Sequence, residues 1–126
     1  MRYLLDTVAF IYATESPGKL GKNAAKVFDD PENLFELSTV SLAEIAIKAA
    51  KGKLNLSLQV VHEAIADLDI RLIPYAADHA FRLFDLPLHH RDPFDRQIIA
   101  QALSENVPLV SPDRQFGLYR GLKVIW

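Results

Sequence analysis

The stretch YLLDTVAFIYAT, residues 3–14, decides how the chain is expected to fold. It begins with a short apolar run, Tyr3 to Leu5, which has the length and composition of a buried strand. Asp6 follows directly, and residues 7–14 are predicted to form a helix that ends at the Ser-Pro-Gly sequence at 16–18. A strand, an acid and a helix in immediate succession are typical of a βα unit, whose sites lie at the carboxyl ends of parallel strands.

The same alternation of strand and helix continues along the rest of the chain. Further strands are predicted at 34–37, 70–73, 109–110 and 122–126. Further helices are predicted at 24–29, 41–50, 57–68, 76–85 and 93–103, with a turn and a short helix within 111–119. The chain of 126 residues is therefore expected to form one domain, residues 1–126, with three α/β/α layers around a mostly parallel sheet.

The composition excludes several classes of site and location. The absence of cysteine excludes disulfides, thiolate nucleophiles and cysteine-ligated metals. The formal net charge of −2 counts against a general binder of duplex DNA, which is usually basic. Charged residues occur within the first six positions, and no apolar run approaches the roughly 20 residues that span a bilayer. We therefore expect a cytoplasmic protein without a signal peptide or a membrane anchor.

Four carboxylates are expected near one edge of the sheet. Asp6 follows the first strand, Asp113 lies three residues after strand 109–110, and Glu44 and Asp95 fall in the first turns of two predicted helices. Carboxylates in one place repel each other and raise each other's pKa unless a positive charge compensates them. Hard cations such as Mg²⁺ and Mn²⁺ prefer carboxylate and water oxygens. The pattern therefore favours a magnesium or manganese site.

Each acid also has an ordinary structural explanation. An acid in the first turn of a helix stabilises the helix dipole by about 0.3–1 kcal/mol. Asp6 is placed to cap the first helix, and Ser41 with Glu44 matches a capping box. Asp95 is equally a first-turn acid, and Asp113 a turn residue. Residue types and spacing alone therefore leave open whether these acids cap helices or bind a metal.

Five segments carry a resemblance to a known family. They are Leu4-Leu5-Asp6-Thr7, the run from Ser41 to Lys48, Gly52-Lys53-Leu54, Asp92-Pro93-Phe94-Asp95-Arg96 with residues 99–102, and the run from Leu109 to Asp113. In this order, and over nearly the whole chain, they resemble PIN-domain proteins and more narrowly the VapC toxins of toxin–antitoxin pairs. Val8 departs from the pattern, since many close relatives carry histidine there.

The resemblance implies a PIN-like fold and an Mg²⁺- or Mn²⁺-dependent endoribonuclease that hydrolyses RNA phosphodiester bonds. The family's catalytic and metal-binding acids correspond to Asp6, Glu44, Asp95 and Asp113. Ser111 corresponds to the serine or threonine that often lies two positions before the fourth acid. The resemblance also implies a cognate VapB-like antitoxin, which wraps the toxin and blocks its acidic pocket, and a homodimer.

Substrate contacts are expected from polar and basic groups around the acids. They are Lys48, Arg96, Ser111 and Arg114. Phosphate contacts from such groups give salt-dependent binding. Two of these side chains have alternatives, because a lysine near a helix end is often only solvated, and Arg96 is also expected to pair with a neighbouring acid.

Further residues beside the acids have secondary roles in this interpretation. Thr7 is an accessory residue, and Asp92 is expected first as the cap of the helix that begins at Pro93 and second as an outer group of the site. His89 and His90 are expected in a surface loop.

Two other functions remain as alternatives from the sequence. A phosphotransfer or haloacid-dehalogenase-like hydrolase also places an aspartate after its first strand, but it needs a second acid where Val8 stands. A catalytically silent PIN-like binding module would keep the fold without turnover. The first helix, with Phe10, Ile11 and Tyr12 beside Val8, is apolar enough either to face another chain or to belong to the core.

Overall fold

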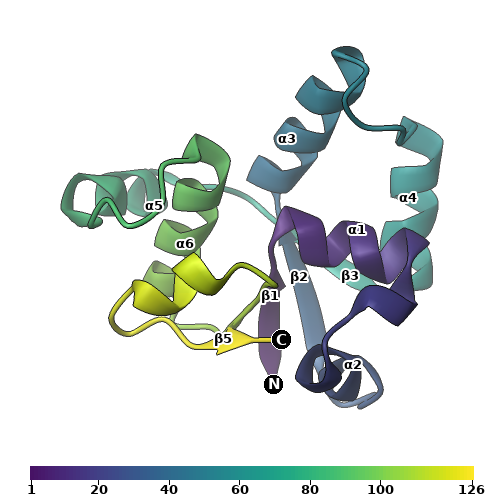
Figure 1. Cartoon of the computed structure of the whole chain (residues 1–126), viewed down its shortest axis with the longest axis horizontal. Coiled ribbons are helices and arrows are strands. Elements are labelled where there is room, and N and C mark those ends of the chain that lie inside the picture. The colour runs from purple at the N-terminus through teal and green to yellow at the C-terminus, as the bar shows by residue number, and fades with distance from the viewer.

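The computed structural model describes all 126 residues, and its strands and helices alternate along the chain (Figure 1). The strands are β1 Arg2–Leu5, β2 Leu34–Ser38, β3 Ile70–Ile73, β4 Leu109–Val110 and β5 Val124–Ile125. The α-helices are α1 Thr7–Glu15, α2 Lys22–Phe28, α3 Thr39–Ala50, α4 Leu58–Asp67, α5 Ala77–Arg82 and α6 Pro93–Glu105. Short 3₁₀ helices are η1 Pro17–Lys19, η2 Leu83–Asp85 and η3 Arg114–Leu118.

The five strands form one sheet in the order β3-β2-β1-β4-β5, and every neighbouring pair is parallel. The predicted α/β class is confirmed, and the mostly parallel sheet is fully parallel. Leu5 at the end of β1 pairs with Leu37 of β2 on one side and with Val110 of β4 on the other. The chain leaves β1 toward β2 and β3, then returns to β4 and β5 on the opposite side. The order of strands therefore switches between β1 and β4, which is where open α/β sheets place their sites.

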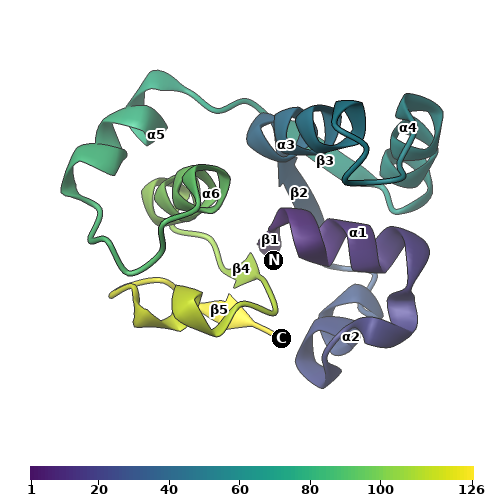
Figure 2. The same cartoon turned by 45° about the horizontal axis from the view of Figure 1, so that its top comes forward.

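Two apolar layers cover the two faces of the sheet (Figure 2). Tyr3 and Leu5 point to the face covered by α1, α2 and α4, where they pack with Phe10. Leu4 points to the opposite face, where it packs with Ile99 of α6, and α5 lies against α6. This alternation follows from the two-residue period of a strand. The three predicted layers are therefore present.

Helix α3 begins earlier than the sequence predicts, and the capping box at Ser41 and Glu44 is wrong. Ser38, the last residue of β2, is the N-cap, and its hydroxyl accepts a hydrogen bond from the backbone N–H of Val40 at 3.1 Å. The strand continues directly into the helix, so that Ser41 is already helical and fully buried. Glu44 consequently lies in the second turn, where it has no capping role.

The other elements differ from the prediction mainly in their bounds. The helix expected at 76–85 is divided into α5 and η2, and the last strand is limited to two residues. Phe10 is fully buried, while only Val8 on α1 is an exposed large apolar residue, so the first helix belongs largely to the core. None of the helices combines the length and the apolar character needed to cross a membrane.

Candidate metal centre

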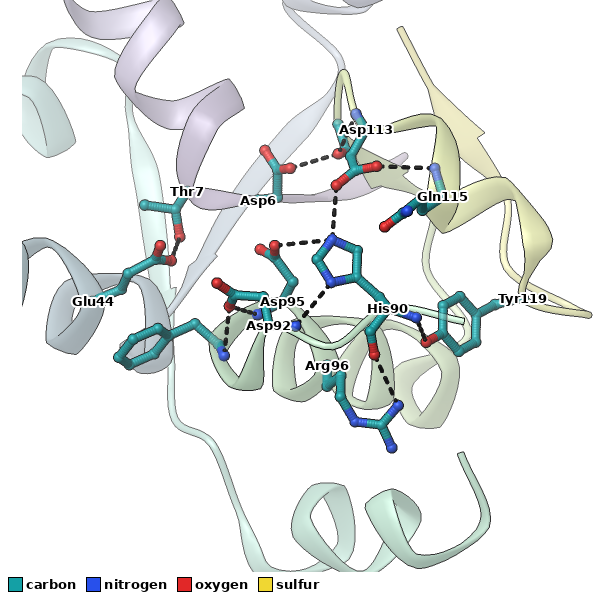
Figure 3. A network of polar contacts seen from close by, with 12 residues as sticks. Asp6, Thr7, Glu44, His90, Asp92, Asp95, Arg96, Asp113, Gln115 and Tyr119 are labelled. Atoms are coloured by element: carbon teal, nitrogen blue, oxygen red, sulfur yellow. Dashed lines mark hydrogen bonds and ion pairs between the residues drawn. The ribbon is translucent and has the colours of Figure 1, made fainter. Parts of the chain in front are cut away.

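Asp6 lies at the carboxyl end of β1, beside the switch between β1 and β4 (Figure 3). It is the N-cap of α1, and its Oδ1 accepts a hydrogen bond from the N–H of Ala9 at 2.7 Å. Its Oδ2 accepts a hydrogen bond from the Ser111 hydroxyl at 2.5 Å. Ser111 follows β4 directly, so this bond joins the two strands that flank the switch. Asp6 is therefore a helix cap and a member of the acidic site at once.

Asp95 and Asp113 are brought together with a histidine from the loop before α6. His90 Nε2 lies 2.8 Å from Asp113 Oδ2 and 3.3 Å from Asp95 Oδ2. The three side chains offer ligand atoms that all lie within 4.8 Å of one another. Asp95 is the third residue of α6, and Asp113 is the N-cap of η3, accepting the N–H of Gln115 at 2.9 Å. The site is thus assembled from helix starts at the carboxyl edge of the sheet.

Burial, and after it the neighbouring negative charges, raise the pKa values of two acids. Burial raises the pKa of Asp6 to about 7, and the charges of Asp95 and Asp113 add to this, while hydrogen bonds from Ser111 and Ala9 oppose it. Burial likewise raises the pKa of Asp95 to about 6, with a further increase from neighbouring acids. Asp6 forms no ion pair with a lysine or arginine. A bound divalent cation would compensate this charge, and the oxygen-rich donor set suits Mg²⁺ or Mn²⁺.

Glu44 is held separately from the other acids, on the side of α3. Its Oε1 accepts a hydrogen bond from the Thr7 hydroxyl at 2.6 Å, and its Oε2 pairs with the ammonium group of Lys48 one turn later. The hydrogen bond to Glu44 raises the pKa of Lys48. Glu44 is 4% exposed, and its charge contributes to the raised pKa of Asp95. The structure therefore groups Asp95 and Asp113 with His90 and places Asp6 beside them, while Glu44 lies at the margin and is already paired.

Asp92 caps α6, as the sequence predicts. Its Oδ1 accepts hydrogen bonds from the N–H groups of Phe94 and Asp95 at 2.9 and 3.0 Å. The Asp92 charge also helps to raise the pKa of Asp95. The residue therefore stabilises the start of the helix that presents Asp95, and its direct participation in the site stays a prediction.

Arg96 does not pair with an acid, so that expectation is wrong. Its guanidinium donates hydrogen bonds to the backbone carbonyls of Leu86, Pro87 and His90 at 2.9–3.2 Å. These carbonyls belong to the turn before α6, and the planar guanidinium holds that turn in place. Arg114 lies at the start of η3 and is exposed. The substrate roles of Lys48, Arg96, Ser111 and Arg114 stay predictions.

His90 is the residue of the site that the sequence prediction missed. It was assigned to a surface loop, yet its side chain is 11% exposed and lies between two acids. Two of its contacts, with Asp113 and with Tyr119, come from residues more than 20 positions away in the chain. No local pattern encodes such contacts; the only signal is that His90 lies two positions before the Asp-Pro-Phe-Asp-Arg segment.

Comparison with known proteins places this arrangement in a family. The model of the PIN domain family matches residues 3–122 of the chain. The chain belongs to the PIN-domain family. PIN domains are typically ribonucleases and usually bind a divalent metal. None of the curated protein sequences matches this PIN domain at a significant level.

Solved structures share the fold of this PIN domain over nearly its full length. VapBC2 from Rickettsia felis, bound to a DNA fragment from its promoter, matches with a TM-score of 0.75 and 20% identity, covering 98% of this chain and 97% of that chain. DNA-bound VapBC from Salmonella typhimurium matches with a TM-score of 0.71 and 16% identity, covering 98% of this chain and 96% of that chain. VapBC-1 from nontypeable Haemophilus influenzae matches with a TM-score of 0.70 and 22% identity, also covering 98% of this chain and 96% of that chain.

Proposed function

We propose that this PIN domain is an Mg²⁺- or Mn²⁺-dependent endoribonuclease and the toxin of a toxin–antitoxin pair. The observation that carries the proposal is the cluster of Asp95, Asp113 and His90, with the buried Asp6 beside it at the switch between β1 and β4. The charges of these three acids are partly buried and lack an arginine or lysine partner. Membership of the PIN family and the fold shared with VapBC structures support the same conclusion.

In this proposal the acids hold the cation and orient the reacting groups. Asp6 and Asp95 supply the principal carboxylate oxygens, and Asp113 supplies a further one from η3. A cation held by these acids would supply the activation of a water molecule and the neutralisation of the charge that develops on the phosphate. Ser111 donates its hydroxyl proton to Asp6 and thereby holds that carboxylate in one orientation. The expected products carry a 5′-phosphate and a 3′-hydroxyl.

Glu44 and Lys48 have a different part in the proposal. The Thr7 hydroxyl orients Glu44, which faces the site from α3 and is suited to accept a proton from the attacking water. Lys48 is 41% exposed and keeps its ammonium group beside Glu44. Asp6, Asp95 and Asp113 repel an approaching RNA phosphate. We therefore expect the phosphate to contact the Lys48 ammonium group first.

One sequence alternative receives no support from the site. A phosphotransfer or haloacid-dehalogenase-like mechanism needs a second acid two residues after Asp6. That position is Val8, whose side chain is 40% exposed on α1. The carboxylates that accompany Asp6 come instead from α6 and η3, which is consistent with a metal-dependent nuclease.

This chain has a groove in which an amphipathic helix of the proposed antitoxin could dock. A groove of about 410 Å³ lies between α3 and α4. Ten of its twelve lining residues are hydrophobic, including Ala46, Ala49, Val61 and Ile65. We expect the protein encoded beside this gene to purify with the chain after co-expression. Ala46→Arg should prevent this association and leave RNA cleavage unchanged; co-purification with the variant would contradict the assignment of the groove.

A second apolar surface of this chain, apart from the groove, is suited to the contact of the proposed homodimer. Phe81, Phe84 and Leu88 lie on α5, on η2 and in the turn that follows, and they are 69%, 87% and 72% exposed. Exposed large apolar groups in close succession are typical of a protein interface. Light scattering should give the mass of a dimer for the parent and of a monomer for Phe84→Asp. A monomeric parent would contradict the proposed dimer.

The central test is RNA cleavage by the purified protein. We expect cleavage with Mn²⁺ that EDTA abolishes, and no cleavage by Asp95→Asn. Asp78→Asn is the matched control, because Asp78 is also a first-turn acid of a helix but its side chain is 72% exposed. If Asp95→Asn cleaves RNA as fast as the parent, the assignment is wrong. If the parent binds no Mn²⁺ at millimolar concentration, the chain is instead a silent binding module.

A further inference from the structure

We infer that His90 positions the acids as a hydrogen-bond donor and is not itself a ligand of the cation. As far as it concerns the cation, the inference rests on the proposed function. The alternative is plain from the geometry, because an imidazole nitrogen at 2.8 Å and 3.3 Å from two carboxylates is also where a histidine ligand would lie. Histidine is a common metal ligand, so the two roles have to be separated by the chemistry of its two nitrogens.

The surroundings of Nδ1 decide which nitrogen carries the proton. The backbone N–H of Asp92 donates a hydrogen bond to His90 Nδ1 at 3.1 Å (Figure 3). A nitrogen that accepts a hydrogen bond is unprotonated, and a neutral imidazole then carries its proton on Nε2. Nε2 therefore donates to Asp113 and lies 3.3 Å from Asp95 Oδ2, and it has no lone pair to offer a metal. A ligating Nε2 would need a proton on Nδ1, which would face the Asp92 N–H.

The ring is held in this orientation by contacts on its other sides. It lies edge-to-face with Phe116 at a centroid distance of 5.4 Å. The backbone N–H of His90 donates to the Tyr119 hydroxyl at 2.8 Å, and the His90 carbonyl accepts from Arg96 at 3.2 Å. Turning the ring by half a rotation would replace both nitrogens with carbons and would lose the hydrogen bonds to Asp92 and Asp113. The geometry thus selects one ring orientation and one tautomer.

This donor has a specific task between two acids that repel each other. Asp95 belongs to α6 and Asp113 to η3, so no backbone hydrogen bond ties the two carboxyl groups to a common element. The Asp113 side chain is 34% exposed; the Gln115 N–H holds its Oδ1, and His90 is the group that holds its Oδ2. Groups that hydrogen-bond to metal ligands typically change metal affinity by about 10- to 100-fold when removed. His90 is therefore a positioning residue for Asp113 and Asp95.

Three variants test this role through Mn²⁺ affinity, measured by calorimetry. His90→Ala removes the donor and should raise the Kd for Mn²⁺ about 10-fold or more. His90→Gln places an amide N–H near the position of Nε2 and should keep the Kd close to that of the parent. His89→Ala is the control, because His89 is the exposed neighbour whose ring contacts Tyr119 and no acid. Thermal unfolding without metal checks that all three variants are folded.

Spectroscopy tests the tautomer and the absence of ligation directly. Nitrogen NMR of the metal-free protein should show a protonated Nε2 and an unprotonated Nδ1 for His90. Pulsed EPR of Mn²⁺ bound to protein labelled with ¹⁵N-histidine should show no directly coordinated nitrogen. A proton on Nδ1, a coordinated nitrogen, or equal Mn²⁺ affinity of His90→Ala and parent would overturn the inference. A parent protein that binds no Mn²⁺ would instead contradict the proposed function. The NMR of the metal-free protein would in that case still test whether His90 is a hydrogen-bond donor through Nε2.

Discussion

Two buried carboxylates, Glu36 within β2 and Asp6 directly after β1, have their charges balanced in different ways. Glu36 in β2 is fully buried and pairs with Arg2 of β1, through contacts of 2.9–3.0 Å, and with Arg71 of β3. Arg2 also reaches Glu105 of α6 at 3.3 Å, so that two acids face two arginines. At the carboxyl edge, Asp6 has only neutral hydrogen-bond donors.

The difference separates an acid that supports the fold from one that serves a site. Burying a charge is costly unless it is paired, and the protein supplies the partners for Glu36 from its own strands. At the carboxyl edge the fold supplies no lysine or arginine partner for Asp6, and burial raises the pKa values of Asp6 and Asp95.

Asp6→Asn should give the largest change. We expect RNA cleavage to fall about 100-fold or more, because a principal cation ligand and its charge are lost. The same variant should unfold at a temperature equal to or above that of the metal-free parent at pH 7.5, because a buried charge without an ionic partner is removed. Cleavage assays and calorimetric melting measure the two effects. A variant that loses activity only because it is unfolded would contradict this prediction.

Glu36→Gln should show the opposite pattern. The substitution leaves two arginines without their shared carboxylate and should lower the free energy of unfolding by about 1–3 kcal/mol, a range reduced by the exposure of the arginines. Denaturant titration measures this loss. Mn²⁺ affinity should stay unchanged, since the Glu36 network does not touch the site. A weaker Mn²⁺ affinity would show that the two groups of acids are coupled.

The metal-free protein should become less stable as the pH rises from about 4 to 7. The pKa of Asp6 is about 7 in the folded state, whereas an unperturbed aspartate has about 3.9, so the folded state binds more protons across this range. Stability therefore falls with rising pH by this contribution, and Asp95 adds to it up to about pH 6. Melting curves should show a smaller fall for Asp6→Asn and for the parent with saturating Mn²⁺. Equal pH profiles of parent and Asp6→Asn would refute the prediction.

Lys48→Gln should have the smallest effect. Removing one phosphate contact is expected to weaken RNA binding a few-fold and to reduce the slope of log K against log salt by about one. Filter binding of Asp95→Asn, which should retain RNA without cleaving it, measures both quantities. Lys51→Gln at the exposed C-cap of α3 is the control. If the two lysine variants behave alike, Lys48 is an ordinary surface lysine.

Much of the fold could be predicted because its signals are local. Asp92-Pro93 determines the start of α6 through one cap and one fixed φ angle, and the structure places the helix there. Ser57 likewise caps α4, with its hydroxyl accepting the N–H of Val60 at 3.2 Å. The start of α3 was predicted wrongly because two serines, Ser38 and Ser41, are both able to cap it. Which one does so depends on where β2 ends in the sheet.

The candidate site was predictable only in part. Residue types and spacing left each acid between a cap and a ligand, and the family resemblance selected the four acids. The structure shows the capping role at Asp6 and Asp113, whose carboxylates also lie at the candidate site, and their role as ligands stays a prediction. Only for Glu44 does the capping alternative disappear, since α3 begins at Thr39.

The sequence by itself determined the alternation of strands and helices and a mostly parallel sheet, because these depend on local periodicity and capping, and its motif order carries the resemblance from which the four acids are predicted. Only the tertiary structure decided which groups meet. The bond from Ser111 to Asp6 joins residues 105 positions apart, and His90 reaches Asp113 across 23 positions. Such contacts depend on the order of the strands and the packing of η3 beside α6, which bring side chains together without leaving a pattern in their neighbours along the chain.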